Sequence, residues 1–410
     1  MVNLTVANVS KRLTEEVIDR CFKIKTNSKD SPKSIVVTKA APAGEGLISA
    51  VYRIHVTGSH HQTSFVAKGL VSDRLLRRSL RCSIFFEREA MFFSQILPQF
   101  KEVQKSSGAK ESIQNNIPIC YAYHIGDEDD YILLEDLSET ACESVATPTK
   151  TERDLTLQAL AHMHAVSIAL RTKRPTVFFE LASKIPEIYY TDSNQAWYAK
   201  YLQNAIDIDK NVIREFEDES SIYFKKFMNL LENDFYRQVR ELLATPMDHP
   251  VMNHGDAWLP NFMCSKKRAV AIDFQLFRCA SLATDLSFYL CLCGNLCLNK
   301  KYFFEAVKIY YNFLEHYLED IGLNASEIFS WEDLWMELKM YGRFGVLAAL
   351  TAIPLLASQR CDVGLPFEDK YGDVERIPLE DLWRLTPIQD LDKKKGLVNA
   401  VRVAVDVGLI

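Results

Sequence analysis

Apolar and polar residues alternate along several short stretches in the first third of the chain. The clearest stretch places Ile48, Ala50, Tyr52, Ile54 and Val56 between more polar neighbours, which is the pattern of a half-buried strand. Together with shorter apolar runs, this pattern predicts strands over residues 34–40, 48–56, 63–70, 119–125 and 131–134. Before them, Leu13, Val17, Cys21 and Phe22 share one helical face and predict a short opening helix.

The pattern changes to a helical period in the rest of the chain. Residues 155–170 predict a core helix that follows a cap at Thr151. Further helical stretches are predicted at residues 178–243, 302–318 and 331–356. A strand-rich part followed by a longer helix-rich part predicts an α+β protein.

Two strings in the helix-rich part carry residues suited to phosphoryl transfer. Asp256 and Asn261 have the spacing D-x-x-x-x-N, and Asp273 ends the short apolar run that begins at residue 269. Phosphoryl transfer to an alcohol needs one carboxylate to accept the hydroxyl proton. It also needs a second carboxylate and an amide to hold Mg²⁺ against the phosphate oxygens. Asp256 fits the first role, and Asn261 and Asp273 fit the second.

The surroundings of these residues differ from those in protein kinases. Gly255 precedes Asp256 where protein kinases have Arg, and Gln275 stands where D-F-G has its Gly. The string H-G-D-x-W-x-x-N followed by I-D-F-Q resembles the ecdysteroid kinase-like family, insect small-molecule kinases related to choline and aminoglycoside kinases. This resemblance implies a two-lobed protein-kinase-like fold, with a small antiparallel-sheet N-terminal lobe over residues 1–137 and a larger, mainly helical C-terminal lobe over residues 138–410.

The same resemblance implies ATP and Mg²⁺ as cofactors and suggests roles for two supporting residues. His164 matches the family's Leu-Ala-x-x-His-Ala, and we expect it to tie its helix to the catalytic loop rather than to act in catalysis. Asp285 matches a family Asp that supports the catalytic loop. Capping of the helix that begins nearby is the competing explanation for Asp285.

Candidate nucleotide-binding residues lie in the strand-rich part. Gly44 and Gly46 fall in a turn between two predicted strands, an arrangement that can place backbone N–H groups over phosphates. An ordinary hairpin would have the same sequence. Lys68 lies in an apolar strand, where an unpaired ammonium would be costly, although a strand lysine can also face water. We therefore expect it to contact a nucleotide phosphate and a helix carboxylate, Glu89 or alternatively Glu87.

The resemblance also suggests where adenine and the acceptor bind. Glu135 and Leu137 match the connection whose backbone binds adenine in kinases. Residues 178–243 resemble the helical insert that shapes the acceptor pocket. Their aromatic residues, including Trp197, favour a broad apolar acceptor over a compact cation, and the acidic run at residues 215–219 is expected to be a separate solvated face.

Net charge, apolar runs and cysteine spacing argue against several classes of protein. A net charge of −6 argues against a nucleic-acid partner. The first residues lack the features of a secretory signal. The apolar run at residues 344–357 is too short to insert across a membrane. The ten cysteines follow no disulfide-scaffold spacing. A cytoplasmic protein is expected, and nothing here indicates its protein partners.

These observations predict an ATP-dependent phosphotransferase that acts on a hydroxyl of a small organic acceptor. The resemblance implies an ecdysteroid or a related hydroxylated steroid-like or xenobiotic compound. The alternatives are a choline- or aminoglycoside-type kinase, a catalytically silent ligand-binding protein of the same fold, and a hydrolase in which Asp256 activates water.

Overall fold

The computed structural model describes residues 4–40, 48–244, 247–297, 299–358, 367–372 and 374–410. Gly44 and Gly46 lie outside these residues. The chain forms two compact units, and each consists of segments that are separate in the sequence. The first unit comprises Met1–Ser94, Pro118–Glu143 and Arg360–Pro378, and the second comprises Gln95–Ile117, Ser144–Gln359 and Leu379–Ile410. The two units therefore do not correspond to a single division of the sequence near residue 137.

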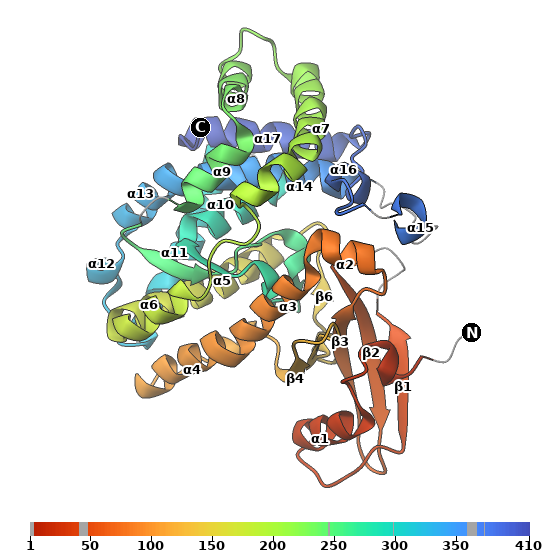
Figure 1. Ribbon diagram of the computed structural model, residues 1–410. Coiled ribbons are helices and arrows are strands. Elements are labelled where there is room, and N and C mark those ends of the chain that lie inside the picture. Colours follow the sequence, from red (N-terminus) through yellow and green to blue (C-terminus); the bar gives the residue numbers. More distant parts are fainter. Residues whose placement is uncertain (1–3, 41–47, 245–246, 298, 359–366, 373) are drawn as a thin grey trace. The chain divides into compact units, whose positions relative to one another are not determined.

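The first unit is built on a five-stranded antiparallel sheet with the order β1-β2-β3-β5-β4 (Figure 1). Its strands, all expected from the sequence, are β1 (Ser34–Lys39), β2 (Ser49–Thr57), β3 (Gln62–Leu70), β4 (Cys120–His124) and β5 (Tyr131–Glu135). Its helices are η1 (Val6–Asn8), α1 (Glu15–Thr26), α2 (Arg74–Leu80), α3 (Cys82–Met91), η4 (Leu137–Thr140) and α15 (Phe367–Tyr371).

Helix α1 packs against this sheet to form the core of the first unit. Ile18 and Phe22 of α1 are fully buried in one cluster with Ile54 of β2, Phe65 of β3 and Leu133 of β5. Of the residues expected to share a helical face, Val17, Cys21 and Phe22 lie on α1 and pack into this cluster, whereas Leu13 belongs to the cluster but precedes the helix. Burial of these side chains gives the sheet a fixed register, because a one-residue slip would turn them outward.

From the sequence, Pro98 is expected to end a helix and residues 101–116 to form a polar surface segment, and the structure contradicts this expectation. A π-helical turn, η2 (Phe92–Ile96), leads into α4 (Leu97–Ser106), where Pro98 occupies the first turn. Proline is tolerated there because the first N–H groups of a helix have no intrahelical acceptor. Phe100 and Val103 of α4 are buried, so this helix is part of a core.

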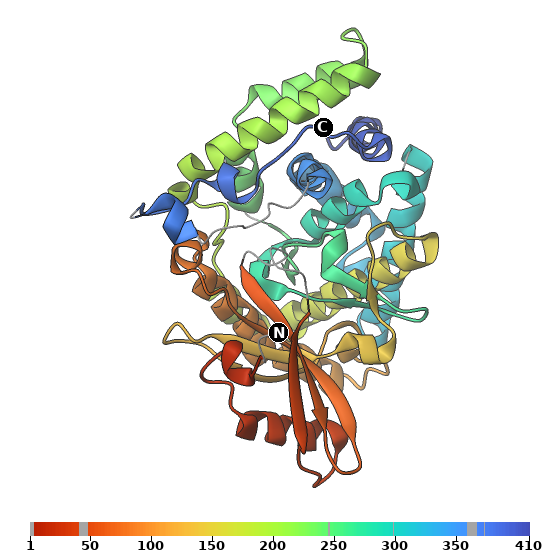
Figure 2. The same ribbon diagram turned by 90° about the vertical axis from the view of Figure 1, so that its right-hand side faces the viewer.

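The second unit is mainly helical (Figures 1 and 2). Its helices are α4, η3 (Ile113–Asn116), α5 (Lys150–Lys173), α6 (Pro175–Ser183), α7 (Asp192–Phe216), α8 (Ile222–Glu232), α9 (Phe235–Ala244), η5 (Leu259–Asn261), η6 (Phe274–Leu276), α10 (Leu282–Leu292), η7 (Gly294–Cys297), α11 (Lys300–Asp320), α12 (Ala325–Ile328), α13 (Trp331–Tyr341), α14 (Arg343–Ala357), α16 (Leu379–Leu382) and α17 (Leu391–Val407). Its strands are β7 (Pro250–Asn253), β8 (Phe262–Cys264), β9 (Ala269–Ala271) and β10 (Arg278–Ser281), and β6 (Glu143–Ser144) begins in the first unit. An α+β protein with a small antiparallel-sheet part and a larger helical part is confirmed.

Helix α5 is the central helix of the second unit. It begins two residues before the expected position, because Thr149 and Glu152 form a reciprocal capping box and Thr151 lies inside the helix. It packs against α4, α6 and α11, and also against β7 and β9. Helix α5 therefore connects the helical core to the strands that carry the catalytic strings.

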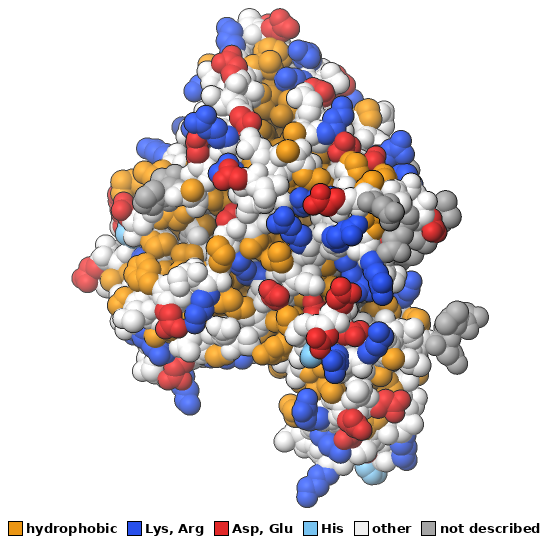
Figure 3. Space-filling view, in the orientation of Figure 1, with side chains coloured by type: hydrophobic (Ala, Val, Ile, Leu, Met, Phe, Trp, Pro, Cys, Tyr) orange, Lys and Arg blue, Asp and Glu red, His pale blue; other side chains and the backbone are white. Residues whose placement is uncertain are grey.

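Two further features concern the helices and the surface. In the described part of the chain, no single helix is long and apolar enough to cross a membrane. Helices α13 and α14 are bent by 53° where they meet. Taken together, this pair passes the test for a membrane span, by length and composition alone. Lys, Arg, Asp and Glu side chains are mixed over the face that Figure 3 shows.

Candidate active site

The string around Asp256 forms a loop that begins where β7 ends. β7 pairs antiparallel with β10, so that Asn253 lies opposite Arg278. Gly255 has φ +78°, and a Cβ at this position would come within 2.0 Å of the carbonyl oxygen of Leu276. No side chain fits there, which explains why glycine stands in place of the protein-kinase arginine.

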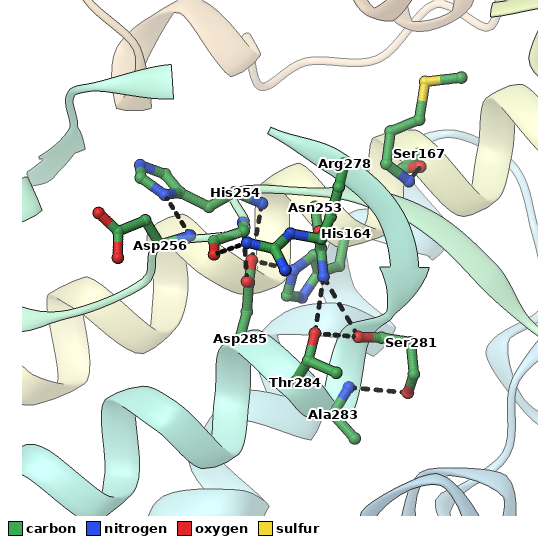
Figure 4. A network of polar contacts seen from close by, with 12 residues as sticks. His164, Ser167, Asn253, His254, Asp256, Arg278, Ser281, Ala283, Thr284 and Asp285 are labelled. Carbon is green, nitrogen blue, oxygen red and sulfur yellow. Dashed lines mark hydrogen bonds and ion pairs between the residues drawn. The ribbon is translucent and has the colours of Figure 1, made fainter. Parts of the chain in front are cut away.

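Asp285 holds the backbone of this loop from below (Figure 4). Its carboxylate accepts hydrogen bonds from the backbone N–H of His254 at 2.7 Å and of Gly255 at 3.0 Å. His164 of α5 contacts the same carboxylate through Nε2 at 3.3 Å, and its Nδ1 lies 2.7 Å from the hydroxyl of Tyr310. His164 therefore ties α5 to the loop through Asp285, as its expected supporting role requires. For Asp285, loop support explains these contacts better than helix capping does, because Ser281 caps α10.

The contacts of Asp285 also shift its ionisation. Burial alone would favour the protonated acid. The hydrogen bond and charge of His164, together with the hydrogen bond from the backbone N–H of His254, outweigh it and hold the pKa of Asp285 below its usual range. Asp285 is therefore a carboxylate that can accept several N–H donors at once, as the loop requires.

His254 links the loop to the second catalytic string. Its Nε2 donates to the carbonyl of Ile272 at 2.9 Å, and its Nδ1 accepts from the backbone N–H of Asp256 at 3.3 Å. The backbone N–H of Ile272 in turn donates to the carbonyl of Asn261 at 2.9 Å. These bonds connect Asp256 and Asn261 to Ile272, the residue directly before Asp273.

Asp256 is oriented by Asn261. The amide Nδ2 of Asn261 donates to Asp256 Oδ2 at 2.9 Å and to the Asp256 carbonyl at 3.0 Å. Burial, reinforced by the negative charge of Asp273, raises the pKa of Asp256 to about 7. A carboxyl with this pKa is a stronger base than an ordinary aspartate and suits proton acceptance near neutral pH.

Asp273 has an unusual backbone conformation. Its φ and ψ are both +68°, in the left-handed region that non-glycine residues adopt at an energetic cost and that is frequent at functional sites. Gln275 Nε2 donates to Asp273 Oδ2 at 3.2 Å. The described residues contain no cluster of three or more His, Cys, Asp or Glu able to hold a metal. An amide with one carboxylate nevertheless suffices for Mg²⁺, which keeps water and phosphate ligands.

The sequence reasoning missed Arg278. This arginine is buried on β10, and its Nη2 donates to the carbonyl of Gly255 at 2.7 Å. The sequence contains no signal for this role, because both partners of Arg278, Gly255 and Glu187, are distant from it in the chain.

The first unit contains the predicted lysine–glutamate pair. Lys68 Nζ lies 2.9 Å from Glu89 Oε2 and 3.0 Å from Oε1, and the two side chains are 11% and 4% exposed. Glu87, the alternative partner, is exposed. A lysine held in this way by a helix carboxylate has a fixed ammonium position on β3.

The predicted adenine connection follows β5 directly. The backbone N–H of Glu135 donates to the carbonyl of Ile119 at 2.8 Å, and the carbonyl of Leu137 accepts from Cys142 N at 3.1 Å. Leu137 is buried. Backbone hydrogen bonds therefore hold both residues of the predicted adenine connection in place.

The connection between α6 and α7, together with α7 itself, contains a cluster of aromatic side chains. The ring centroids of Tyr189 and Tyr190 are 4.9 Å apart, and those of Tyr189 and Tyr198 are 5.0 Å apart. Trp197 is partly exposed beside Tyr198, with a centroid distance of 5.3 Å. These aromatic rings are candidates for contact with an acceptor.

The expectation that residues 215–219 form a solvated face is wrong for one of them. Glu217 is 9% exposed and pairs with Arg402 of α17 at 2.5 Å. Helix α17 packs against both α7 and α8, which form a hairpin (Figure 2). This acidic run therefore attaches the hairpin to α17.

Comparison with known proteins assigns the chain to a family. The model of the ecdysteroid kinase-like family matches residues 43–323, and the chain belongs to this family. It is accordingly a small-molecule phosphotransferase, the class of enzyme expected from the sequence. No curated protein matches the chain.

Several solved structures resemble it at low identity. They include the ethanolamine kinase of Plasmodium vivax, with 13% identity, a TM-score of 0.40, and coverage of 91% of this chain and 82% of that one. The choline kinase of Cryptosporidium parvum has 13% identity, a TM-score of 0.40 and 84% coverage of each chain. A spectinomycin phosphotransferase in complex with ADP and spectinomycin has 12% identity, a TM-score of 0.40, and coverage of 95% of this chain and 99% of that one.

Proposed function

We propose that this protein transfers a phosphoryl group from ATP to a hydroxyl of an ecdysteroid or a related hydroxylated, steroid-like compound. The observation that carries the proposal is a network of hydrogen bonds. In this network Asn261 orients Asp256, and His254 connects Asp256 to Ile272, the residue before Asp273. Family membership supports it independently. The proposed class of acceptor rests on the family's description and on the aromatic cluster.

Asp256 is the proposed proton acceptor. Its oxygen Oδ2 is held by Asn261 at 2.9 Å, and its pKa of about 7 lets it take the hydroxyl proton at neutral pH. As the acceptor oxygen forms its bond to phosphorus, the proton passes to the Asp256 carboxylate. The bond from phosphorus to the leaving ADP oxygen breaks at the same centre.

Asn261 and Asp273 are the proposed ligands of Mg²⁺. The Nδ2 of Asn261 is engaged by Asp256, so its Oδ1 is the atom for a cation. The negative charge of Asp273 raises the Asp256 pKa, and a crowded pair of carboxylates of this kind favours a divalent cation nearby. When bound, Mg²⁺ neutralises charge on the phosphate oxygens.

The first unit supplies the proposed nucleotide contacts. Lys68, fixed by Glu89, would pair with phosphate oxygens. The backbone of Glu135 and Leu137 would contact adenine. Gly44 and Gly46 would place backbone N–H groups at the phosphates, and this assignment rests on the sequence alone.

The decisive experiment follows the acceptor by mass. The purified protein is incubated with Mg²⁺, ATP and ecdysone, and in parallel with choline, and each acceptor is examined for the added mass of one phosphoryl group. Phosphorylated ecdysone is the expected product. Phosphorylated choline would identify the alternative kinase class. Release of phosphate with both acceptors unchanged would indicate a hydrolase, and neither reaction would indicate a silent ligand-binding protein.

The Asp256→Asn substitution tests the proton acceptor. The variant should fold and bind ATP, because it removes only ionisation from a carboxyl that burial already disfavours as an anion. Its turnover should fall by roughly 100-fold or more. Nucleotide binding is measured by calorimetry and turnover by product mass. Near wild-type turnover would exclude Asp256 as the base.

A further inference from the structure

Arg278 is a buried cation shared by two segments of the second unit. Its side chain is 5% exposed, its Nη2 donates to the carbonyl of Gly255 at 2.7 Å, and its Nη1 forms an ion pair with Glu187 Oε2 at 3.0 Å. Glu187 lies in the connection between α6 and α7. Because a guanidinium is rigid and planar, partners on two of its nitrogens are held at a fixed separation.

Glu187 extends this link to the aromatic cluster. Its second oxygen, Oε1, accepts hydrogen bonds from the backbone N–H of Tyr189 at 2.7 Å and of Tyr190 at 2.9 Å. The carbonyl of Tyr189 accepts from the hydroxyl of Tyr236 at 3.1 Å and from Asn194 Nδ2 at 2.9 Å. Both the N–H groups and a carbonyl of this connection are thus held by side-chain hydrogen bonds, which is unusual for a segment outside helices and strands.

The tyrosine rings of this connection pack against other aromatic rings. Burial raises the pKa of both Tyr189 and Tyr190, and the negative charge of Asp256 contributes to each shift. The Tyr190 ring also packs against Tyr236, with centroids 5.6 Å apart, and against Phe344 at 6.4 Å. The backbone of both tyrosines is therefore fixed to the Asp256 loop through Glu187 and Arg278, and the Tyr190 ring is held by its aromatic neighbours.

We propose that Glu187 and Arg278 are positioning residues for the acceptor, because together they hold Tyr189 and Tyr190 at a fixed place relative to the loop of Asp256. The inference rests on the proposed function and deepens it. Tyrosine rings offer a flat apolar surface with hydroxyl partners, which suits an uncharged, hydroxyl-bearing ring compound. The charge of Glu187 is already paired with Arg278, so it is not available to a cationic acceptor.

The Glu187→Gln substitution separates the two contacts of Glu187. Glutamine keeps an oxygen for the N–H groups of Tyr189 and Tyr190 but loses the charge that pairs with Arg278. With ecdysone as the probe, the KM for ecdysone should rise about tenfold, while the KM for ATP stays within about twofold. Arg278→Gln should also lower kcat, because Arg278 contacts the catalytic loop. The double variant should be no worse than Arg278→Gln alone.

Glu217→Gln is the matched control. It removes one charge from a pair with Arg402 in the same unit, and both KM values should stay within about twofold of wild type. If Glu187→Gln behaved like Glu217→Gln, or raised the KM for ATP as much as that for ecdysone, the positioning role would be excluded.

A second measurement does not depend on the acceptor. Hydrogen exchange of the Tyr189 and Tyr190 amides should be faster in Arg278→Gln than in wild type, although their acceptor Glu187 is intact, and unchanged in Glu217→Gln. Unchanged exchange in Arg278→Gln would overturn the inference. If wild-type protein leaves ecdysone unmodified, the proposed acceptor class fails, and this exchange comparison alone decides whether Arg278 positions the tyrosines.

Discussion

Asp256 combines two properties of a proton acceptor, a fixed orientation and a pKa near neutrality. The orientation comes from Asn261 at 2.9 Å. The pKa of about 7 comes first from burial and then from Asp273, while Arg278 and Asn261 oppose the shift. Removal of any one of these groups would therefore change the pKa of Asp256, and with it the fraction of the enzyme in which Asp256 is deprotonated at a given pH.

This pKa predicts the pH dependence of turnover. Only the deprotonated carboxylate accepts a proton, so kcat/KM should rise as pH increases through about 7 and then level off. Arg278→Gln removes a positive charge that lowers the Asp256 pKa and should move the midpoint to higher pH. Initial rates over a buffered pH series check both statements. A flat profile through neutrality, or a midpoint that moves to lower pH in Arg278→Gln, would contradict them.

At the scale of elements, the catalytic loop owes its shape to groups outside itself. Asp285 of α10 accepts two consecutive loop N–H groups, and His164 of α5 contacts that carboxylate. The loop contains Gly255 in a conformation that no side chain fits. A segment of this kind needs external acceptors for its buried N–H groups.

Asp285→Asn hardly changes the size of the side chain, but it should therefore disturb the loop strongly. An amide offers one oxygen and would turn an NH₂ group toward N–H donors, which leaves a buried donor unsatisfied. We expect a loss of about 2–4 kcal/mol in the free energy of unfolding and a fall in kcat of roughly 10- to 100-fold from the misplaced base. Urea unfolding and steady-state kinetics measure the two effects.

Asp320→Asn is the matched control for this prediction. Asp320 also accepts two consecutive backbone N–H groups, those of Lys110 at 3.0 Å and Glu111 at 3.0 Å, but it is only partly buried. Its substitution should cost less stability and leave kcat unchanged. Equal losses of kcat in the two variants would mean that Asp285 acts only through overall stability.

At the scale of the whole molecule, one buried carboxyl reduces stability. Asp209 of α7 is fully buried, and neither of its carboxyl oxygens has a hydrogen-bond partner among the described residues. Burial raises its pKa well above the usual range. The folded state therefore binds this proton more tightly than the unfolded state, and stability falls as pH rises above the unfolded pKa of about 3.9.

Asp209→Asn should remove this loss. At slightly alkaline pH the variant should be more stable than wild type, by about 1–3 kcal/mol, and the difference should shrink as the pH is lowered toward the unfolded pKa. Thermal or urea unfolding at several pH values measures it, with Asp207→Asn, an exposed neighbour on the same helix, as the control. A difference that does not depend on pH would show that Asp209 is not ionised on unfolding.

The sequence by itself determined the class of the protein and much of its local structure. Period-two alternation predicted the strand over residues 48–56, because the side of a strand that faces a core must be apolar, and short apolar runs predicted the other strands of the first unit. The spacing of Asp256, Asn261 and Asp273 predicted the chemistry, since those functional groups are few and their order is restrictive. The cost of a buried ammonium predicted a carboxylate near Lys68, and Glu89 is that carboxylate.

The tertiary structure decided what depends on partners distant in the chain. Pro98 was assigned to a helix end because the sequence does not show that Phe100 and Val103 have a core to join. Residues 215–219 were assigned to solvent because their partner Arg402 is 185 residues from Glu217. Arg278 was missed for the same reason, since only the folded chain brings Gly255 and Glu187 to its two ends. Sequence patterns record which groups must be buried or paired, whereas the choice of partner is made by long-range packing.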